Sequence, residues 1–316
     1  MTKLFEVLVE ALNSKERTAK VYSATIRRVH REVYGKELDN TNLKFIKSVK
    51  TYNYVKKIVN LTRRKNAATA LLMGSKAIEA PGSVQERYRK VMLDADEAYR
   101  QFLLSGKRKR NFVNAEQSWK LITGLHKKPH KEIEARSLWS VGSRVTPAEY
   151  RTIMAWIYLK FLSTGVAPRR LEYTDMRLIS KKDFEALEEK KDNYIVMGKR
   201  SWKIHFFLFK TVGKFGPQVL TVPGPLKAAL NKIKPIAFAK NSKGFIFLTG
   251  RWKRMSRSQF SALVKWIFKT YAKKSWTQNT VRSIKISSVF TGENPLKLAR
   301  DMAHGIETAA LHYRQA

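Results

Sequence analysis

The sequence of 316 residues contains no cysteine. This absence excludes disulfide bonds, cysteine-ligated zinc or iron–sulfur centres and thiol nucleophiles. Acidic residues are also scarce: the chain has 25 Asp and Glu and 63 Lys and Arg, so its formal net charge is +38 at pH 7. Such an excess opposes folding through self-repulsion unless a polyanion offsets it. Nucleic acid is the polyanion we expect, since a basic protein gains affinity by displacing its condensed counterions.

Long apolar runs are missing as well. The sequence has no stretch of about 18 apolar residues that could cross a membrane and no basic amphipathic anchor. The beginning, MTKLFEVLVEALNSKERTAK, carries Glu6 and Glu10 inside its apolar stretch, so we expect no secretory signal peptide. We therefore predict an intracellular protein located at DNA, in a host cytoplasm or nucleoid or in a nucleus, without membrane partners.

Motifs for metal and nucleotide binding are absent too. The six histidines show no HExxH-type spacing, and the chain has no glycine-rich phosphate loop. We expect no metal site and no cofactor. Any phosphate chemistry would then have to depend on side chains alone.

The pattern of apolar residues divides the chain into two parts. Residues 1–136 show helical spacing, interrupted by the breaker APGS at 80–83. TPAE at 146–149 begins a new helix with a capping threonine and an early proline. The runs NYIVMG, KIHFFLF and QVLTVP then predict short strands, and helical spacing returns from 225. We predict a mainly α fold: a helical N-terminal domain (1–136), a linker (137–145), and an α+β domain (146–316) with a small antiparallel sheet.

Transfer of a DNA phosphodiester on side chains alone needs an oxygen nucleophile, cations at the non-bridging oxygens and an acid for the leaving oxygen. Arginine suits the cation role because its planar fork binds phosphate and stays charged. TGVAPRRLEY (164–173) places Arg169 at the predicted start of a helix, where phosphate is favoured. Glu172 follows three residues later on the same face and would orient the arginine. The alternative is an exposed basic helix start.

Three further stretches supply the remaining groups. Lys210 ends a predicted strand at a turn in HFFLFKTVGKFGPQVLTVP (205–223). Asn279 and Arg282 are three residues apart, on one face of a predicted helix, in TQNTVRSIKIS (277–287). His304 and Tyr313 are nine residues apart in the final stretch DMAHGIETAALHYRQA (301–316). Taken singly, each stretch also fits a solvated basic surface or a terminal aromatic residue.

In this order the stretches resemble the tyrosine recombinase (phage integrase) family. Its signature is an arginine in a TG…R..E turn, a hairpin lysine, a His-x-x-Arg helix, and a Gly-His followed nine residues later by the nucleophilic tyrosine. The resemblance spans most of 146–316, and residues 12–74 are loosely similar to the family's core-binding domain. Two positions depart from the pattern: Asn279 replaces the histidine of the helix and cannot carry a proton, and Ala303 replaces the late glycine.

The resemblance implies a site-specific DNA recombinase or integrase that works without metal, with 146–316 as its catalytic domain. Tyr313 would attack the scissile phosphate to give a 3′-phosphotyrosine, while Arg169 and Arg282 hold that phosphate. Lys210 would protonate the leaving oxygen, and His304 would hydrogen-bond the phosphate or assist proton transfer. On one straight helix, nine residues at about 100° each put His304 and Tyr313 on opposite faces. Either the helix is interrupted between them, or Tyr313 acts in the site of another protomer.

The resemblance also implies double-stranded DNA as the partner, held in a C-shaped clamp by both domains. Four protomers would assemble on two sites, with accessory DNA-bending or directionality factors. APRRLEYTDMR and the basic N-terminal domain favour a viral or mobile-element integrase that acts in DNA integration. Five basic residues are candidate DNA contacts in the N-terminal domain: Arg27, Arg28, Arg63, Arg64 and Lys65.

Two alternatives share part of this interpretation. A type IB topoisomerase or a telomere resolvase would use the same chemistry without exchanging partner strands. A non-catalytic DNA-binding or genome-packaging protein on a decayed recombinase fold would explain the high charge and the asparagine at 279. The retained tyrosine, arginines and lysine favour the enzyme.

Overall fold

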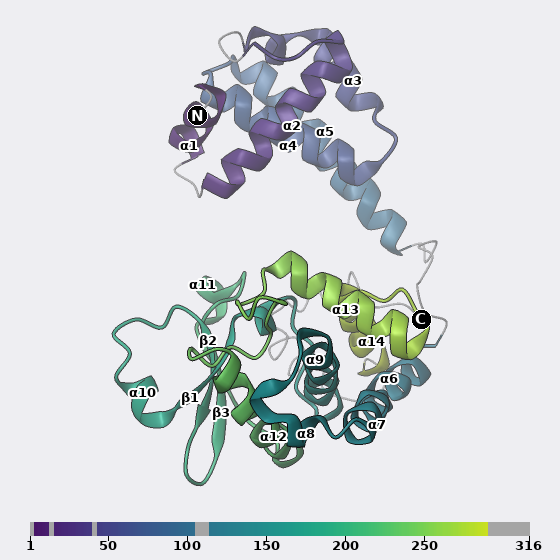
Figure 1. The fold of residues 1–316 in the computed structure, drawn as a ribbon. Helices are drawn as coiled ribbons and strands as arrows, with labels where there is room; N and C mark the ends of the chain where they lie inside the picture. Colours follow the sequence, from purple (N-terminus) through teal and green to yellow (C-terminus); the bar gives the residue numbers. More distant parts are fainter. Residues whose placement is uncertain (1–2, 13–15, 40–42, 105–113, 290–316) are drawn as a thin grey trace. The chain divides into compact units, whose positions relative to one another are not determined.

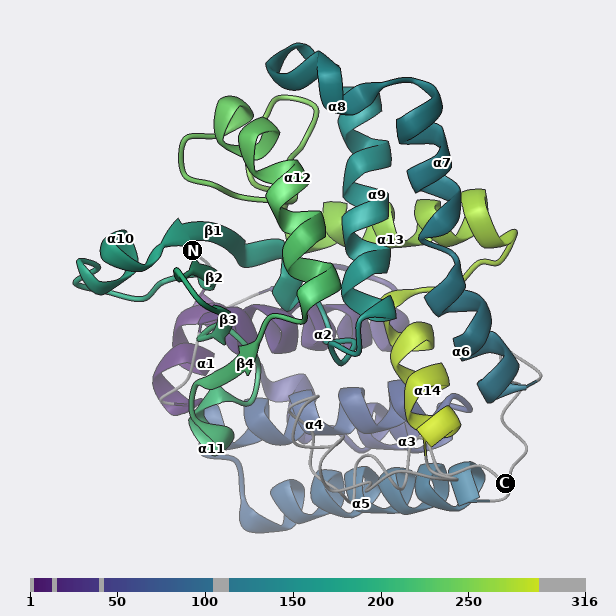
Figure 2. The same ribbon diagram turned by 90° about the horizontal axis from the view of Figure 1, so that it is seen from below.

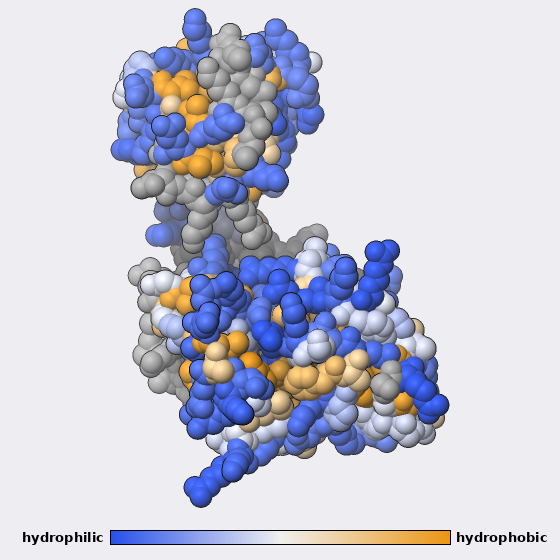
Figure 3. Space-filling model, turned by 60° about the vertical axis from the view of Figure 1, so that its left-hand side comes forward, coloured by the Kyte–Doolittle hydropathy of each residue, from blue (hydrophilic) through white to orange (hydrophobic). Residues whose placement is uncertain are grey.

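The computed structural model describes residues 3–12, 16–39, 43–104 and 114–289 (Figure 1). In these ranges the protein is mainly helical and contains one four-stranded sheet, which confirms the predicted fold class. The chain divides into two compact units, Met1–Arg108 (unit 1) and Lys109–Ala316 (unit 2). On the face drawn in Figure 3 both units are covered largely by hydrophilic side chains, as the charge of the sequence requires. No helix in the described ranges is long and apolar enough to cross a membrane.

The regular elements of unit 1 in the described ranges are all helices. They are α1 (Lys3–Leu12), α2 (Glu16–Tyr34), α3 (Val49–Lys57), α4 (Leu61–Ala77) and α5 (Gly82–Leu104), with a 3-10 turn at Lys44–Lys47. The Asn60 side chain caps α4 by accepting a hydrogen bond from the amide of Arg63 at 2.9 Å. α4 packs along α5 and against α1 and α2. Gly74 permits this approach, because a Cβ there would lie 3.0 Å from the Cδ1 atoms of Ile26 and Ile46.

Unit 2 is organised around one buried helix, α9. Its helices are α6 (Ala115–Gly124), α7 (Lys127–Ala135), α8 (Leu138–Val141), α9 (Pro147–Ser163), α10 (Lys181–Glu185), α11 (Val212–Phe215), α12 (Gly224–Lys240), α13 (Arg257–Ala272) and α14 (Gln278–Val289). α9 begins at the predicted capping box of Thr146 and Glu149. It is apolar on nearly all sides, and α6, α7, α12 and α13 pack around it (Figure 2). The end of α9 therefore has a fixed position in the unit.

The boundary between the units differs from the predicted one at 136. Helices α6 and α7 pack against α9, and α6 also packs against α14, so they belong to unit 2. Ile122, Leu125 and Ile133 are part of its hydrophobic core. The predicted linker 137–145 forms α8 and a 3-10 turn at Gly142–Arg144, with Leu138 and Val145 buried. The polar and glycine residues of this region mark turns within a unit and do not separate two domains.

The sheet is mixed, whereas the sequence predicted an antiparallel one. Its strands are β1 (Met176–Ser180), β2 (Asn193–Met197), β3 (Trp202–Phe206) and β4 (Gln218–Thr221), in the order β1-β2-β3-β4. The three predicted strands, β2 to β4, pair antiparallel. The additional strand β1 pairs parallel to β2, which is possible because residues 181–192, including α10, form the crossover. Both edges of the sheet thus come from segments next to the candidate site residues.

Candidate functional site

Arg169 lies in the loop that follows α9, and not at the start of an α-helix as predicted. Gly165 ends α9 with a φ of 83°, a left-handed conformation that glycine adopts readily. The residues around Arg169 are not helical, and only a 3-10 turn begins at Glu172 and continues to Asp175. The position of the arginine is therefore set by packing and side-chain contacts, not by a helix N-terminus.

The guanidinium group of Arg169 is held against the sheet. Its side chain is 1 % exposed, and its Cζ atom lies 3.7 Å from the ring centroid of Phe206 and 5.5 Å from that of Phe209. These are cation–π distances. Its Nη2 atom donates a hydrogen bond to Oε1 of Gln218. Because Phe206 ends β3 and Gln218 begins β4, Arg169 lies against the connection between these strands.

Lys210 is located in this connection. It follows the buried Phe209 directly and is exposed in the turn before α11, four residues after the end of β3. The packing of Phe209 under Arg169 thus brings the turn that carries Lys210 to the arginine. The lysine was predicted at the end of a strand, and the structure places it in the turn instead.

Asn193 fixes the segment that leads to Lys210. Its buried side chain donates from Nδ2 to the carbonyl oxygens of Glu172 (2.8 Å) and Leu208 (3.3 Å). Its Oδ1 accepts from the amides of Phe207 (2.9 Å) and Leu208 (2.8 Å). One side chain therefore joins the 3-10 turn after Arg169 to the end of β3. The sequence analysis missed Asn193, although a polar first residue in the apolar strand NYIVM is a detectable signal.

Gln278 connects α14 to the loop of Arg169. Its side chain is 3 % exposed, and its Nε2 atom donates a hydrogen bond to the carbonyl oxygen of Arg169. Its Oε1 atom accepts from the hydroxyl of Tyr158 on α9. Arg282, 2 % exposed, is one turn further along α14, on the same face as Gln278. Asn279 is exposed, so its side chain does not share the buried environment of Arg282.

The positive charges of Arg169 and Arg282 both affect the pKa of the Tyr173 hydroxyl. This buried hydroxyl donates a hydrogen bond to the carbonyl of Ala167 at 2.9 Å. The pKa of Tyr173 is raised, mainly by burial. The charge of Glu172 also raises it, whereas the charges of Arg169 and Arg282 lower it. Arg169, Glu172 and Arg282 are all buried, and each is near enough to Tyr173 for its charge to affect the pKa of that residue.

Glu172 affects Tyr173 through its charge. It is buried, and its Oε2 atom accepts no hydrogen bond from the described residues. The orienting hydrogen bond to Arg169 that the sequence suggested is therefore not made by this oxygen. His304 and Tyr313 lie outside the described residues.

The candidate DNA contacts in unit 1 differ in their surroundings. Arg28 is exposed on α2, and Arg27 is half-buried beside it. The other three have partners within the unit: Arg63 with Glu32, Arg64 with the carbonyl of Ile58, and Lys65 with Asp96. Exposed ion pairs contribute only about 0–1 kcal/mol. Arg63 and Lys65 can therefore exchange their carboxylate partners for a phosphate at little cost.

Within the described ranges, no group of three or more His, Asp or Glu side chains is arranged to hold a metal ion. No protein-family model and no curated protein matches the chain. Among solved structures the chain is similar to the "Crystal structure of XerA recombinase", with a TM-score of 0.43 and 13 % sequence identity over 99 % of this chain and 94 % of that chain.

Proposed function

We propose that the protein cuts and rejoins double-stranded DNA as a tyrosine-type site-specific recombinase or integrase. The observation that carries the proposal is the pair of buried arginines, Arg169 and Arg282, whose segments are joined by the hydrogen bond from Gln278 to the carbonyl oxygen of Arg169. Two fixed cations in a place of low dielectric constant stabilise the charge that develops on a transferring phosphate. Arginine is suited to this task because its donors match the oxygens of phosphate.

In the proposed reaction the hydroxyl oxygen of Tyr313 attacks the scissile phosphorus and loses its proton, which His304 accepts, and the bond to the 5′ oxygen breaks. Lys210 gives that oxygen a proton. The resulting 3′-phosphotyrosine keeps the energy of the phosphodiester, so that attack by a 5′ hydroxyl rejoins the DNA and frees the tyrosine. No step needs a metal or a nucleotide cofactor.

The position of Lys210 supports this assignment. Phe209, the residue before it, packs under Arg169, and Asn193 fixes the backbone at 207 and 208. The exposed lysine is therefore attached to a rigid base next to the arginine, as a general acid requires. Asn279 is exposed on α14 and accessible to hydrogen-bond a phosphate oxygen.

The proposal includes duplex DNA as the partner of both units and a homotetramer on two DNA sites. Arg28 is the exposed candidate contact of unit 1, and Arg63 and Lys65 would join it after exchanging their partners. Such contacts go to phosphate and position the protein without reading sequence. Action at DNA inside a cell, and an origin in a virus or mobile element, remain predictions from the sequence.

Covalent trapping tests the proposal. The protein is incubated with nicked duplexes that carry the end sequences of its own element, in the presence of a metal chelator, and then denatured. We expect a protein–DNA adduct that is lost in Tyr313→Phe and Arg282→Ala. Tyr99→Phe, which removes a tyrosine hydroxyl from unit 1, is the matched control and should form the adduct.

Three other outcomes would support the alternatives instead. Tight binding of these duplexes without an adduct would contradict the enzyme and favour a DNA-binding protein. An adduct that forms on any duplex, with relaxation of supercoiled plasmids that lack the site, would identify a type IB topoisomerase. Closure of a single duplex into hairpin ends would identify a telomere resolvase.

A further inference from the structure

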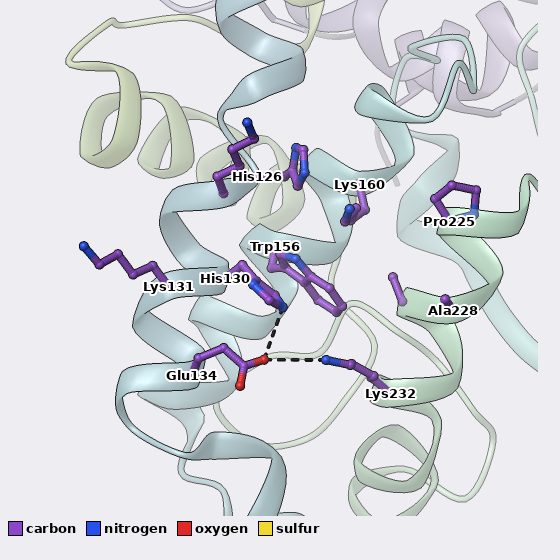
Figure 4. Close-up of a pocket in the computed structure, with 11 residues that line it drawn as sticks. His126, His130, Lys131, Glu134, Trp156, Lys160, Pro225, Ala228 and Lys232 are labelled. Carbon is purple, nitrogen blue, oxygen red and sulfur yellow. Dashed lines mark ion pairs between the residues drawn. The ribbon is translucent and has the colours of Figure 1, made fainter.

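A pocket of about 450 Å³ opens in unit 2 between α7, α9 and α12 (Figure 4). His126, at the N-cap of α7, and then His130 and Glu134 lie at successive turns along one side. Trp156 and Lys160 of α9 form the back, and α12 closes the opposite side. None of the candidate strand-transfer residues that the structure describes lines it. Its volume is within the range of small-molecule sites, which is about 300–1,000 Å³.

The single carboxylate of the pocket is already engaged. Glu134 accepts a hydrogen bond from the indole of Trp139 at 2.8 Å and pairs with Nε2 of His130 at 3.2 Å and with Lys232 at 3.5 Å. The hydrogen bond from Trp139 is the main cause of its lowered pKa, so this carboxylate stays ionised. Glu134 and Lys232 thus close one end of the pocket between α7 and α12 (Figure 4).

At the other end, positive charge is left without acidic partners. Lys127 and Lys160 line the pocket, and neither has an acidic partner among the described residues. Burial lowers the pKa of Lys160. Burial also lowers the pKa of His126, and the charges of Lys160, Lys127 and His130 lower it further. These groups repel one another, and a bound anion would relieve that repulsion.

Two groups that an anion can engage belong to the same end. Nδ1 of His126 lies 2.7 Å from the carbonyl oxygen of Thr123 and must donate to it, so Nε2 donates to an anion only in the protonated ring, a form that a bound anion favours. Trp156 is 2 % exposed, and its Nε1 donor is buried without an acceptor among the described residues. Buried donors are normally satisfied. An anion that sits deep in the pocket, against the indole, would supply the missing acceptor.

We infer that this pocket binds a phosphate group, held by Lys160 and His126 with Lys127 at its rim. The phosphate belongs either to a small free ligand or to the backbone of bound DNA, and both present the same tetrahedral oxygens. The site shares no residue with the described part of the proposed strand-transfer centre, which comprises Arg169, Lys210, Asn279 and Arg282. Its test therefore succeeds or fails independently of that proposal.

The first experiment measures binding of inorganic phosphate by calorimetry, at constant ionic strength kept with chloride. Lys160→Met removes the cation at the back of the pocket but keeps an apolar stem of similar length. Lys234→Met removes the same charge from an exposed position of α12 that does not line the pocket. We expect Lys160→Met to weaken phosphate binding roughly tenfold, as for loss of one charged hydrogen bond, and Lys234→Met to change it little.

The second experiment measures the affinity of the same variants for duplex DNA at several salt concentrations. If the phosphate belongs to DNA, Lys160→Met alone weakens duplex binding and reduces the salt slope by about one, with no saturable binding of inorganic phosphate. If the ligand is free, inorganic phosphate binds saturably, and both variants bind DNA alike. Equal behaviour of the two variants in both experiments overturns the inference. Thermal melting shows that each variant is folded.

Discussion

The side-chain amide of Gln278 donates to the carbonyl oxygen of Arg169, a residue 109 positions earlier in the chain. The same amide accepts a hydrogen bond from Tyr158, so one side chain joins α9, the arginine loop and α14. Arg282 follows one turn later on α14. The backbone of one arginine and the helix of the other are thus held together through the side chain of Gln278.

Replacement of Gln278 by leucine should separate the arginines and destabilise unit 2. The substitution leaves the buried carbonyl of Arg169 and the hydroxyl of Tyr158 without partners, which costs about 1–3 kcal/mol for each group. Chemical denaturation measures the free energy of unfolding, and the trapping experiment measures cleavage. Gln117→Leu, at an exposed position on α6, is the matched control. A Gln278→Leu protein as stable and active as the control would show that this link does not position the arginines.

The variants Arg169→Lys and Arg282→Lys should bind DNA but fail to cleave it. Lysine keeps the positive charge, but it cannot offer the planar set of donors that binds two phosphate oxygens at once. At 169 it also loses the stacking of a flat group on Phe206. Filter binding and adduct formation on the same duplex separate the two properties. Arg251→Lys, an exposed substitution in unit 2, should have neither effect. Normal cleavage by both lysine variants would argue against a bidentate role of these arginines.

Asn193→Asp should be among the most destabilising single-atom changes in unit 2. The carboxylate still accepts from the amides of Phe207 and Leu208, but it cannot donate to the carbonyl oxygens of Glu172 and Leu208. A buried charge facing two carbonyl oxygens costs several kcal/mol, and we expect a loss of about 3–5 kcal/mol.

The comparison for this change is Asn231→Asp, which adds the same charge at an exposed position of α12. Thermal melting of both variants measures the difference. The turn that carries Lys210 should also become susceptible to limited proteolysis in Asn193→Asp only. Equal melting temperatures for the two variants would mean that the hydrogen bonds of Asn193 do not hold the turn.

Local signals predicted many of the elements, although the helix expected at Arg169 is a loop, whereas contacts between distant segments could not be predicted from local signals. The capping box of Thr146 and Glu149 fixes the start of α9 from four neighbouring residues, and the strands β2 to β4 follow from apolar runs. Strand β1 was missed because its partner begins 17 positions later across α10, from Met176 to Asn193. The domain boundary was misplaced because only the tertiary packing of α6 and α7 on α9 decides it.

The residues of the candidate site likewise fall into those that a sequence motif predicts and those that only distant contacts reveal. Arg169 and Arg282 were predicted as site residues from their order in the chain, and both are buried in unit 2, where their charges lower the pKa of Tyr173. Gln278 and Asn193 belong to no recognised motif, because their function is to bind backbone groups from segments far away in the sequence. Polar residues that stand alone in apolar elements are the general signal for such roles, and Asn193 at the start of β2 is an example.

The free energy of unfolding of unit 2 should fall when Asp175 loses its proton. In an ordinary ion pair, ionisation of the carboxylate raises it. Asp175 is buried and lies 3.4 Å from Arg254 and 3.6 Å from Arg257. Even so its pKa is raised, because the effect of burial exceeds the lowering effect of these arginines, and Asp192 raises it further. The folded state therefore binds this proton more tightly than the unfolded state does. The stabilisation from protonation is complete below the unfolded pKa, about 3.9, and is lost as the pH rises through the folded value.

Asp175→Asn removes this titration, so the free energy of unfolding of the wild type should fall relative to the variant between about pH 3 and about pH 7. Denaturant unfolding at several pH values, followed by a signal from unit 2, measures the difference. Glu188→Gln, which neutralises an exposed carboxylate in the same unit, should run parallel to the wild type. If the wild type instead gained stability over Asp175→Asn with rising pH, the two arginines would outweigh burial, and Asp175 would be an ordinary stabilising partner of α13.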